Sequence, residues 1–163
     1  MRELLIPPRG RGFVPFPEPP RLVIDKSLGR DPRDWEMFQD YWLVSDRMKI
    51  LLETLDSEGA RFVRCESRYR DNRVAPTYWL CDIVRVLDAV DEANSVLKIE
   101  YPTPDWKVYK LHGSSLVFKE EIVGAAHIFR LCFYPRIVCD QAFKDACKES
   151  AVKGIAFTDA RKY

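Results

Sequence analysis

Histidine and cysteine are the side chains of this sequence best suited to metal binding or nucleophilic catalysis. The 163 residues contain two histidines, His112 and His127, and five cysteines, at positions 65, 81, 132, 139 and 147. No CxxC pair occurs, and neither histidine stands at a zinc-ligand spacing from the other or from a cysteine. The odd number of cysteines also argues against a disulfide framework. We therefore expect reduced, mostly buried thiols, no metal site and no cofactor.

A thiol nucleophile is the one catalytic arrangement that these residue types leave open. Cys81, Cys132 or Cys139 would need His127 as its base, and such partners meet in space rather than in sequence. His127 alternates with Phe129 along an expected strand, which favours a structural histidine. The motifs GxGxxG, GxxxxGK[ST] and GxSxG do not occur. We predict that the protein is not an enzyme, with a thiol-dependent enzyme as the alternative class.

Charge balance and apolar run length argue against three further classes: nucleic-acid-binding, membrane-spanning and secreted proteins. The chain has 26 basic and 25 acidic side chains, for a formal charge of +1, whereas general nucleic-acid-binding domains carry a basic excess. No stretch approaches the roughly 18 apolar residues that span a bilayer. The apolar run at residues 4–6 is far shorter than the roughly 7–15 residues of a secretory signal. We expect a cytoplasmic protein with no membrane segment and no nucleic-acid partner.

Proline divides the chain into two regions. Seven of the eleven prolines lie in the first 32 residues, which excludes a long helix there. Residues 1–32 are therefore expected to form a Pro-rich extended arm, with strand character at 21–25. The apolar side chains of Phe13, Val14 and Phe16 would hold this arm against the surface of a domain formed by residues 33–163.

The first local pattern of this domain is a strand–helix–strand unit over residues 44–65. Ser45 is placed to cap a helix. The strand expected at 60–65 follows Gly59, which would end the helix in a left-handed conformation, and Phe62 would return the chain to the core. The helix is predicted by apolar residues at positions 48, 51, 52 and 55.

A second unit with the same order is expected near the end of the chain. Residues 137–140 lead into a helix with Phe143, Ala146, Cys147 and Ala151 on one face. Gly154 would end that helix as Gly59 ends the first, and residues 154–158 would form the return strand. Phe157 is the counterpart of Phe62, and both are expected to be buried.

The middle of the chain is rich in β-branched and aromatic residues. Residues 77–87 favour a long strand, with a short helix as the alternative, and residues 119–123 favour one helical turn. Further strands are expected at residues 96–101, 107–111, 115–118 and 126–132, with a turn at 102–105. The sequence thus predicts a single-domain α+β fold with few helices, in which two strand–helix–strand units flank a mostly antiparallel or mixed sheet.

The neutral total charge conceals two acidic stretches. Residues 31–58 hold eight acidic against three basic side chains, and residues 82–105 hold six against two. Both stretches also contain or adjoin tryptophan and tyrosine. Since aromatic residues anchor interfaces and opposite charge steers encounter, these stretches suit a basic protein partner. The alternative is that the aromatic residues belong to the core and the charges are ordinary surface.

Six short motifs follow one another between about residues 40 and 158. They are Trp42-Leu43-Val44-Ser45-Asp46, Tyr78-Trp79-Leu80, Val86 to Asp91 with Ser95, Leu116-Val117-Phe118, Gly124 with His127 to Leu131, and Ile137 to Asp140 with Gly154 to Phe157. In this order they resemble the myxobacterial-type immunity-protein domain of bacterial polymorphic-toxin systems, formerly a domain of unknown function. Cys139 stands where that family tends to have serine, and the resemblance does not extend to residues 1–32.

The resemblance implies a cytoplasmic antidote that binds a cognate toxin encoded nearby, often a nuclease. Stoichiometric inhibition is expected, with a catalytic thiol-dependent antidote or a non-catalytic scaffold or oligomerisation domain as the alternatives, and a homodimer is left open. The motif residues would preserve the fold, so the toxin would contact other, acidic and aromatic, surface. The interface candidates are Asp34, Glu36, Asp40, Asp88, Asp91, Glu92, Tyr101, Asp105 and Trp106.

Overall fold

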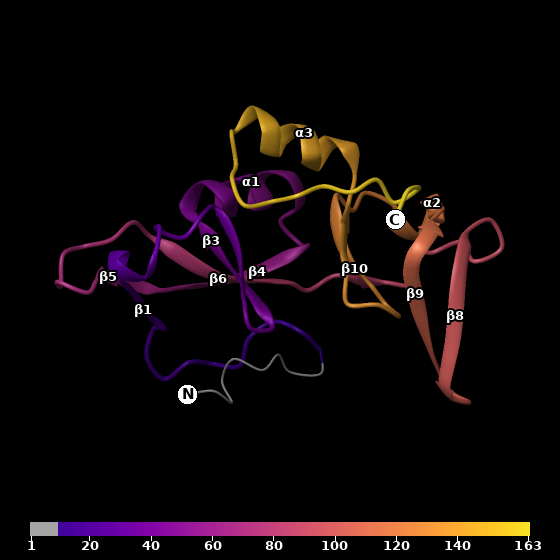
Figure 1. Ribbon diagram of the computed structural model, residues 1–163, viewed down its shortest axis with the longest axis horizontal. Coiled ribbons are helices and arrows are strands. Elements are labelled where there is room, and N and C mark those ends of the chain that lie inside the picture. Colours follow the sequence, from indigo (N-terminus) through magenta and orange to yellow (C-terminus); the bar gives the residue numbers. More distant parts are fainter. Residues whose placement is uncertain (1–9) are drawn as a thin grey trace.

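A four-stranded antiparallel sheet forms one half of the molecule in the computed structural model, which describes residues 10–163 (Figure 1). Its strands lie in the order β2-β3-β6-β4. They are β2 (Trp35–Phe38), β3 (Tyr41–Ser45), β6 (Tyr78–Ile83) and β4 (Ala60–Arg64). The aromatic and branched side chains of β3 and β6 suit the buried centre of a sheet.

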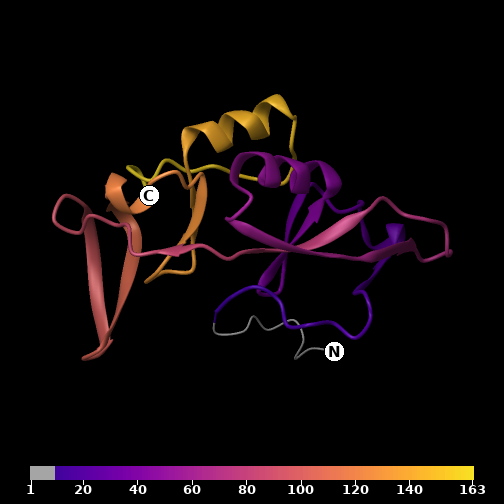
Figure 2. The same cartoon turned by 180° about the vertical axis from the view of Figure 1, so that it is seen from behind.

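Two helices, α1 (Asp46–Asp56) and α3 (Gln141–Glu149), lie on the same side of this sheet (Figures 1 and 2). Their first turns are capped by side chains: the Ser45 hydroxyl accepts from the Met48 amide at 3.2 Å, and Asp140 accepts from the Phe143 amide at 2.9 Å. The predicted cap at Ser45 is confirmed. A buried cluster between helices and sheet includes Val44, Met48, Leu52, Ile83, Ile128 and Phe143.

The Pro-rich segment covers the opposite face of the sheet. Phe13 and Phe16 pack against a cluster that contains Leu43 and Leu80, and the Phe13 ring lies 4.6 Å from the Tyr41 ring. After them, β1 (Arg21–Ile24) pairs in parallel with β5 (Glu66–Tyr69), and a 3-10 turn follows at Lys26–Leu28. The division of the chain at residue 32 stays a prediction, but residues 10–32 make extensive contact with the rest.

A buried carboxylate fastens the start of this segment. Asp82 on β6 is fully buried, and it accepts hydrogen bonds from the guanidinium of Arg11, from the Gly12 amide at 2.7 Å and from Arg130 at 3.3 Å. The Tyr41 hydroxyl donates to the Gly12 carbonyl at 3.0 Å. A buried charge is tolerated only when it is paired in this way, so residues 11 and 12 complete the interior of the sheet.

The other half of the molecule is built around a long hairpin of β8 (Val96–Thr103) and β9 (Trp106–Ser115), which extends away from the body in both views (Figures 1 and 2). Beside it, a three-stranded sheet has the order β11-β10-β7. Its strands are β7 (Val86–Leu87), β10 (Ile128–Leu131) and β11 (Ile137–Cys139), and α2 (Glu120–Val123) is a short helix nearby. Tyr109, Leu111, Leu116 and Phe129 are among the residues of this half's buried cluster.

The α+β class, with few helices and mostly antiparallel strands, is confirmed. The long strand at 77–87 is wrong in extent, because the chain breaks at residues 84–85 and passes from β6 into β7 of the next sheet. The strand expected at 107–111 is longer, because β9 runs from Trp106 to Ser115. The strand expected at 115–118 is wrong: residues 116–118 form no strand, and Phe118 makes only an isolated bridge with Val90.

The second strand–helix–strand unit lacks its return strand. Residues 154–158 form no strand; at this point Trp35 donates to the Lys153 carbonyl at 3.2 Å, which ties the segment to the edge of β2. Gly154 has φ +101°, and a Cβ there would lie 2.2 Å from the Trp35 carbonyl oxygen. Phe62 and Phe157 both pack on the helix-side cluster but are only partly buried.

Gly59 also differs from its prediction. It does not have a positive φ, and its place is explained by close packing, since a Cβ would lie 3.1 Å from both Asp56 and Ile128. The Asp56 carboxylate accepts from the amides of His127 and Ile128 at 2.9 and 3.3 Å and from Arg85. Gly59 therefore lets the end of α1 pack tightly against the start of β10, where an added Cβ would require its neighbours to shift by a few tenths of an ångström.

Candidate functional site

The nine predicted interface residues fall into two groups, and one member of the first lies in the interior. Asp34 is 7% exposed and accepts from Arg47 at 2.9 Å, from the Ser45 hydroxyl at 2.7 Å and from the Lys153 amide at 2.8 Å. Burial alone would raise the pKa of this carboxyl, but these donors together hold the pKa below its ordinary value. Asp34 is thus a structural residue that joins β2, α1 and the segment after α3.

The other two members of the first group lie on the β2–β3 hairpin. Glu36 is half-buried and pairs with Arg30 and Arg33. Asp40 is exposed, near Met37 and Phe38, of which Met37 is the more exposed. This region offers one unengaged carboxylate beside apolar side chains.

The second group gathers around the β8–β9 hairpin. Every residue from Tyr101 to Trp106 is exposed, and this run includes the turn of the hairpin. Tyr101 is 65% and Trp106 49% exposed. Asp105 lies in the turn and Asp88 lies just after β7, both exposed. We call the side chains of Asp88, Tyr101, Asp105 and Trp106 the hairpin surface.

Lys107 links this surface to the loop that precedes β8. Its ammonium donates to Glu92 Oε1 at 2.6 Å, and the Tyr109 hydroxyl donates to the same oxygen at 2.6 Å. The hydrogen bond to Glu92 raises the pKa of Lys107, and the charge of Asp88 adds to that effect. The same contacts, the bond from Lys107 first, lower the pKa of Glu92. These charges are satisfied within the protein, and they tie the start of β9 to the loop before β8.

An aromatic stack supports the exposed tryptophan. The ring of Trp106 meets that of Phe133 edge to face at 5.4 Å, and Phe133 meets the buried Tyr109 in the same way at 5.5 Å. The Lys107 ammonium lies 4.4 Å from the centre of the Phe133 ring. Trp106 is therefore held from one side while its other side faces solvent. A large aromatic side chain that is held in place but exposed is typical of an interface anchor.

Asp91 has a structural role in its own turn. Its carboxylate accepts from the Asn94 amide at 3.2 Å and from the Asn94 side chain at 2.7 Å, which closes the turn before β8. Of the nine candidates, Asp40, Asp88, Tyr101, Asp105 and Trp106 are exposed. The carboxylates of the other four form hydrogen bonds or ion pairs with other residues of the protein.

The pKa values of the cysteine thiols are raised, which is the opposite of what a catalytic nucleophile needs. Catalytic cysteines have a depressed pKa, whereas burial raises the pKa of Cys139 to about 12 and that of Cys65 and Cys147 to about 11. Burial likewise raises the pKa of Cys81 and Cys132. Nothing in this geometry favours the thiol-dependent alternative.

His127 is held by a carboxylate. Its Nδ1 lies 2.7 Å from Asp140 Oδ2, and Asp140 is also the N-cap of α3. The backbone amide of His127 donates to Asp56, so the residue links β10 to both helices. Among residues 10–163, no three or more side chains of metal-binding type lie close enough together to hold an ion.

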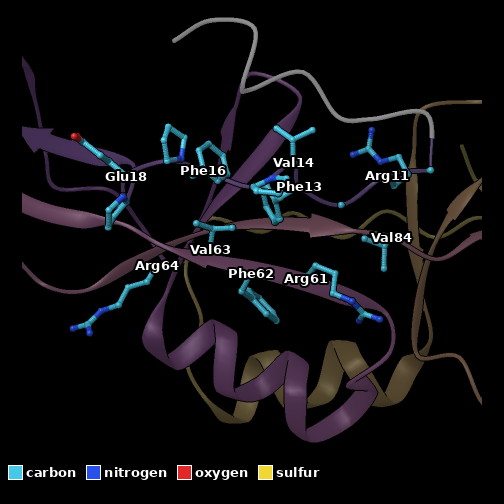
Figure 3. Close-up of a pocket in the computed structure, with 15 residues that line it drawn as sticks. Arg11, Phe13, Val14, Phe16, Glu18, Arg61, Phe62, Val63, Arg64 and Val84 are labelled. Atoms are coloured by element: carbon cyan, nitrogen blue, oxygen red, sulfur yellow. The ribbon is translucent and has the colours of Figure 1, made fainter.

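A groove of about 890 Å³ lies between the Pro-rich segment and β4 (Figure 3). Residues 10–19 form one wall and residues 61–64 the other. Figure 3 shows Val63 pointing toward Phe13 and Phe16, while Phe62 points to the helix side of the sheet. Sequence analysis did not identify this groove, because its walls are about forty residues apart along the chain.

Taken together, these features describe an α+β protein whose projecting hairpin carries exposed aromatic and acidic side chains. The chain belongs to the immunity protein family (Imm11), whose family model matches residues 1–162. The match includes the Pro-rich segment that the six motifs left out, in agreement with its packing on the sheet. No curated protein matches the chain. Membership of the family gives this chain an immunity role, with a toxin as its partner in general.

The part of the chain that the structure describes has no helix with the length and apolar character needed to cross a bilayer.

Proposed function

We propose that this chain neutralises a cognate toxin by forming a one-to-one complex with it through the hairpin surface. The observation that carries the proposal is the position of Trp106, which is supported by Phe133 and yet half exposed at the end of a projecting hairpin. Tyr101 lies on the opposite strand close to the same turn. Tryptophan and tyrosine contribute most to binding when they are held in advance in the bound conformation.

The charge of the surface indicates the chemistry of the toxin. Asp88 and Asp105 are exposed, and neither makes an ion pair within residues 10–163. A basic patch on the toxin would complement them and speed the encounter. A nuclease is one class with such a patch, because it binds phosphates. We propose that blocking that patch is how the protein inhibits, and that toxin and antidote meet in the cytoplasm, where the five free cysteines stay reduced.

Titration against the toxin encoded beside this gene tests the proposal. The two proteins should co-elute, and toxin activity should fall linearly to zero at an equimolar ratio. Activity that persists in molar excess of this protein, or inhibition at far less than one equivalent, would contradict stoichiometric binding.

A charge-reversal pair identifies the contact region. Asp105→Lys should weaken the complex at least tenfold, because it places a cation opposite a basic patch. Asp40→Lys reverses the same charge on the β2–β3 hairpin and should have little effect. The opposite ranking would move the interface to residues 31–42.

A further inference from the structure

The edge of the four-stranded sheet at β4 has free backbone groups. Within residues 10–163, β6 is the only strand that pairs with β4 in the sheet. Two bonds fix which of its residues face that neighbour: Cys65 donates to Tyr78 at 3.0 Å, and Gly59 accepts from Val84 at 2.9 Å. In an antiparallel pair, hydrogen-bonded and non-bonded residues alternate. The residues between Gly59 and Cys65 must therefore alternate in the same way.

It follows that Arg61 and Val63 direct their backbone groups to β6, whereas Phe62 and Arg64 direct theirs outward. Within residues 10–163, no protein group bonds to the outward N–H and C=O of Phe62 and Arg64. The groove of Figure 3 lies along this edge. Its other wall, residues 10–19, packs over the face of the sheet. The open part of the edge ends at Arg64, because the Glu66 amide donates to the Pro20 carbonyl at 2.8 Å and β1 pairs along the edge from there.

The molecule has a second long edge, on β8, but that edge is protected against strand addition. Register shifts interrupt β8 on both sides of Lys98–Glu100, and Pro102 lacks an N–H. Bulges, lysine and proline are the usual means by which edge strands avoid pairing. Strand β4 has no proline, and its register with β6 is continuous from Ala60 to Arg64. Of these two edges, β4 is the one suited to accept a further strand.

Charge determines what that strand would be. Arg61 and Arg64 flank the edge; Arg61 lies 3.4 Å from Glu58, and Arg64 makes no ion pair within the described part of the chain. A second copy of the protein would bring four guanidinium groups to one seam, and their mutual repulsion opposes that pairing. An extended segment with carboxylates would instead be attracted.

We infer that the open edge of β4 is a docking site for an extended, acidic segment of a partner protein, which adds to the sheet as a further strand. Backbone bonds to Phe62 and Arg64 supply the register, as in other cases of strand addition. Carboxylates of the segment pair with Arg64, and its apolar side chains enter the groove beside Val63 and Phe16. This site is separate from the hairpin surface and takes a partner of opposite charge.

Calorimetric titration of the full-length protein with blocked synthetic peptides tests the inference. A short peptide that alternates valine and glutamate should bind, and a matched peptide that alternates valine and lysine should not. Failure of the glutamate peptide to bind, or equal binding of both peptides, would overturn the proposal. The proposal would also be overturned if the wild-type protein sediments as a dimer without peptide and the Arg64→Glu variant sediments as a monomer.

Two substitutions of Arg64 distinguish the contribution of its charge to peptide binding from that of its backbone N–H. Arg64→Ala should weaken binding of the glutamate peptide about tenfold, which is the typical cost of a lost charged hydrogen bond. Arg64→Pro should weaken it about fivefold further, because proline also removes the outward N–H without touching the β6 ladder. Arg68→Ala, an exposed arginine on β5, is the matched control and should leave binding unchanged.

The peptide-binding measurements need no toxin, so they test the β4 site separately from the proposed toxin interface. If Arg64→Pro unfolds, Arg64→Glu still decides the matter, because it should abolish binding of the glutamate peptide. Trp106→Ala should bind the glutamate peptide like the wild type. Loss of peptide binding in Trp106→Ala with no change in Arg64→Glu would assign the peptide to the hairpin surface and exclude β4.

Discussion

Trp106 and Phe133 pack edge to face, with ring centres 5.4 Å apart and an angle of 67° between the rings. Phe133 belongs to the loop after β10, whereas Trp106 begins β9, so the contact fixes the turn of the hairpin to the body of the protein. If the hairpin surface binds the toxin, this contact has already restricted Trp106 before the toxin arrives, and less conformational entropy is lost on binding.

Trp106→Ala should weaken the toxin complex by about 2 kcal/mol or more, the loss expected for a central anchor. Phe133→Leu should weaken it by about 1 kcal/mol, because Trp106 loses its support. The double variant should lose less than the sum of the two, since both act on the same ring. Dissociation constants and thermal unfolding of all three variants test this, and wild-type affinity in Trp106→Ala would contradict the hairpin interface.

Removal of the Asp82 carboxylate should destabilise the protein strongly. Asp82→Ala leaves Arg11 and Arg130 without their buried partner, and breaking a buried pair costs about 3–5 kcal/mol. Asp71→Ala removes a carboxylate from an exposed pair with Arg73 and should destabilise the protein far less, because solvent screens that pair. Urea unfolding measures both, and equal losses would mean that the Asp82 contacts are not formed.

Gly154→Ala should be costly for two reasons, of which one can be isolated. The left-handed φ alone costs roughly 1 kcal/mol in a residue with a side chain, and the new Cβ would also collide with the Trp35 carbonyl. Gly113→Ala provides the control, because Gly113 has φ +72° and open space around it. The excess loss of stability in Gly154→Ala over Gly113→Ala measures the collision.

Stability should fall in acid. Hydrogen bonds and charge hold the pKa values of Asp34 and Asp56 below their ordinary value, against the effect of burial. A group whose pKa is lower in the folded state stabilises the fold above its unfolded pKa, near 4, and this stability is lost as pH falls through the folded pKa. The free energy of unfolding should therefore decrease below about pH 4, and the decrease should be smaller in Asp34→Asn.

The cysteines should react slowly while the protein is folded. Burial raises the pKa of Cys139 to about 12, so almost none of it is thiolate at neutral pH. Iodoacetamide labelling, followed by mass spectrometry, should proceed far more slowly than in the urea-unfolded chain. Rapid labelling of one cysteine in the folded state would revive the thiol-dependent alternative.

Local sequence signals identified most of the regular elements. Ser45 and the spacing of Met48, Leu51 and Leu52 fixed α1, because capping and helical periodicity act within a few residues. The resemblance identified the family from six motifs and missed the Pro-rich segment, whose contacts with Tyr41 and Asp82 are distant in sequence.

The remaining differences depend on contacts that no local pattern contains. Residues 154–158 have strand-like composition, but they form no strand. Trp35 on the edge of β2 bonds to the Lys153 carbonyl, and Gly154, with φ +101°, follows at once. Asp34 and Asp105 look alike in sequence as acidic residues near a tryptophan. Only the fold distinguishes them, by enclosing Asp34 among Arg47, Ser45 and Lys153 and leaving Asp105 in solvent.

The Asp34 contacts also determine when in its synthesis this protein can become stable. The carboxylate needs the amide of Lys153, which lies 119 positions later in the chain. Loops of that length close slowly, and contacts of high sequence separation delay folding. A ribosome must therefore have made almost the whole polypeptide before the carboxylate of Asp34, just ahead of β2, has all of its hydrogen-bond donors.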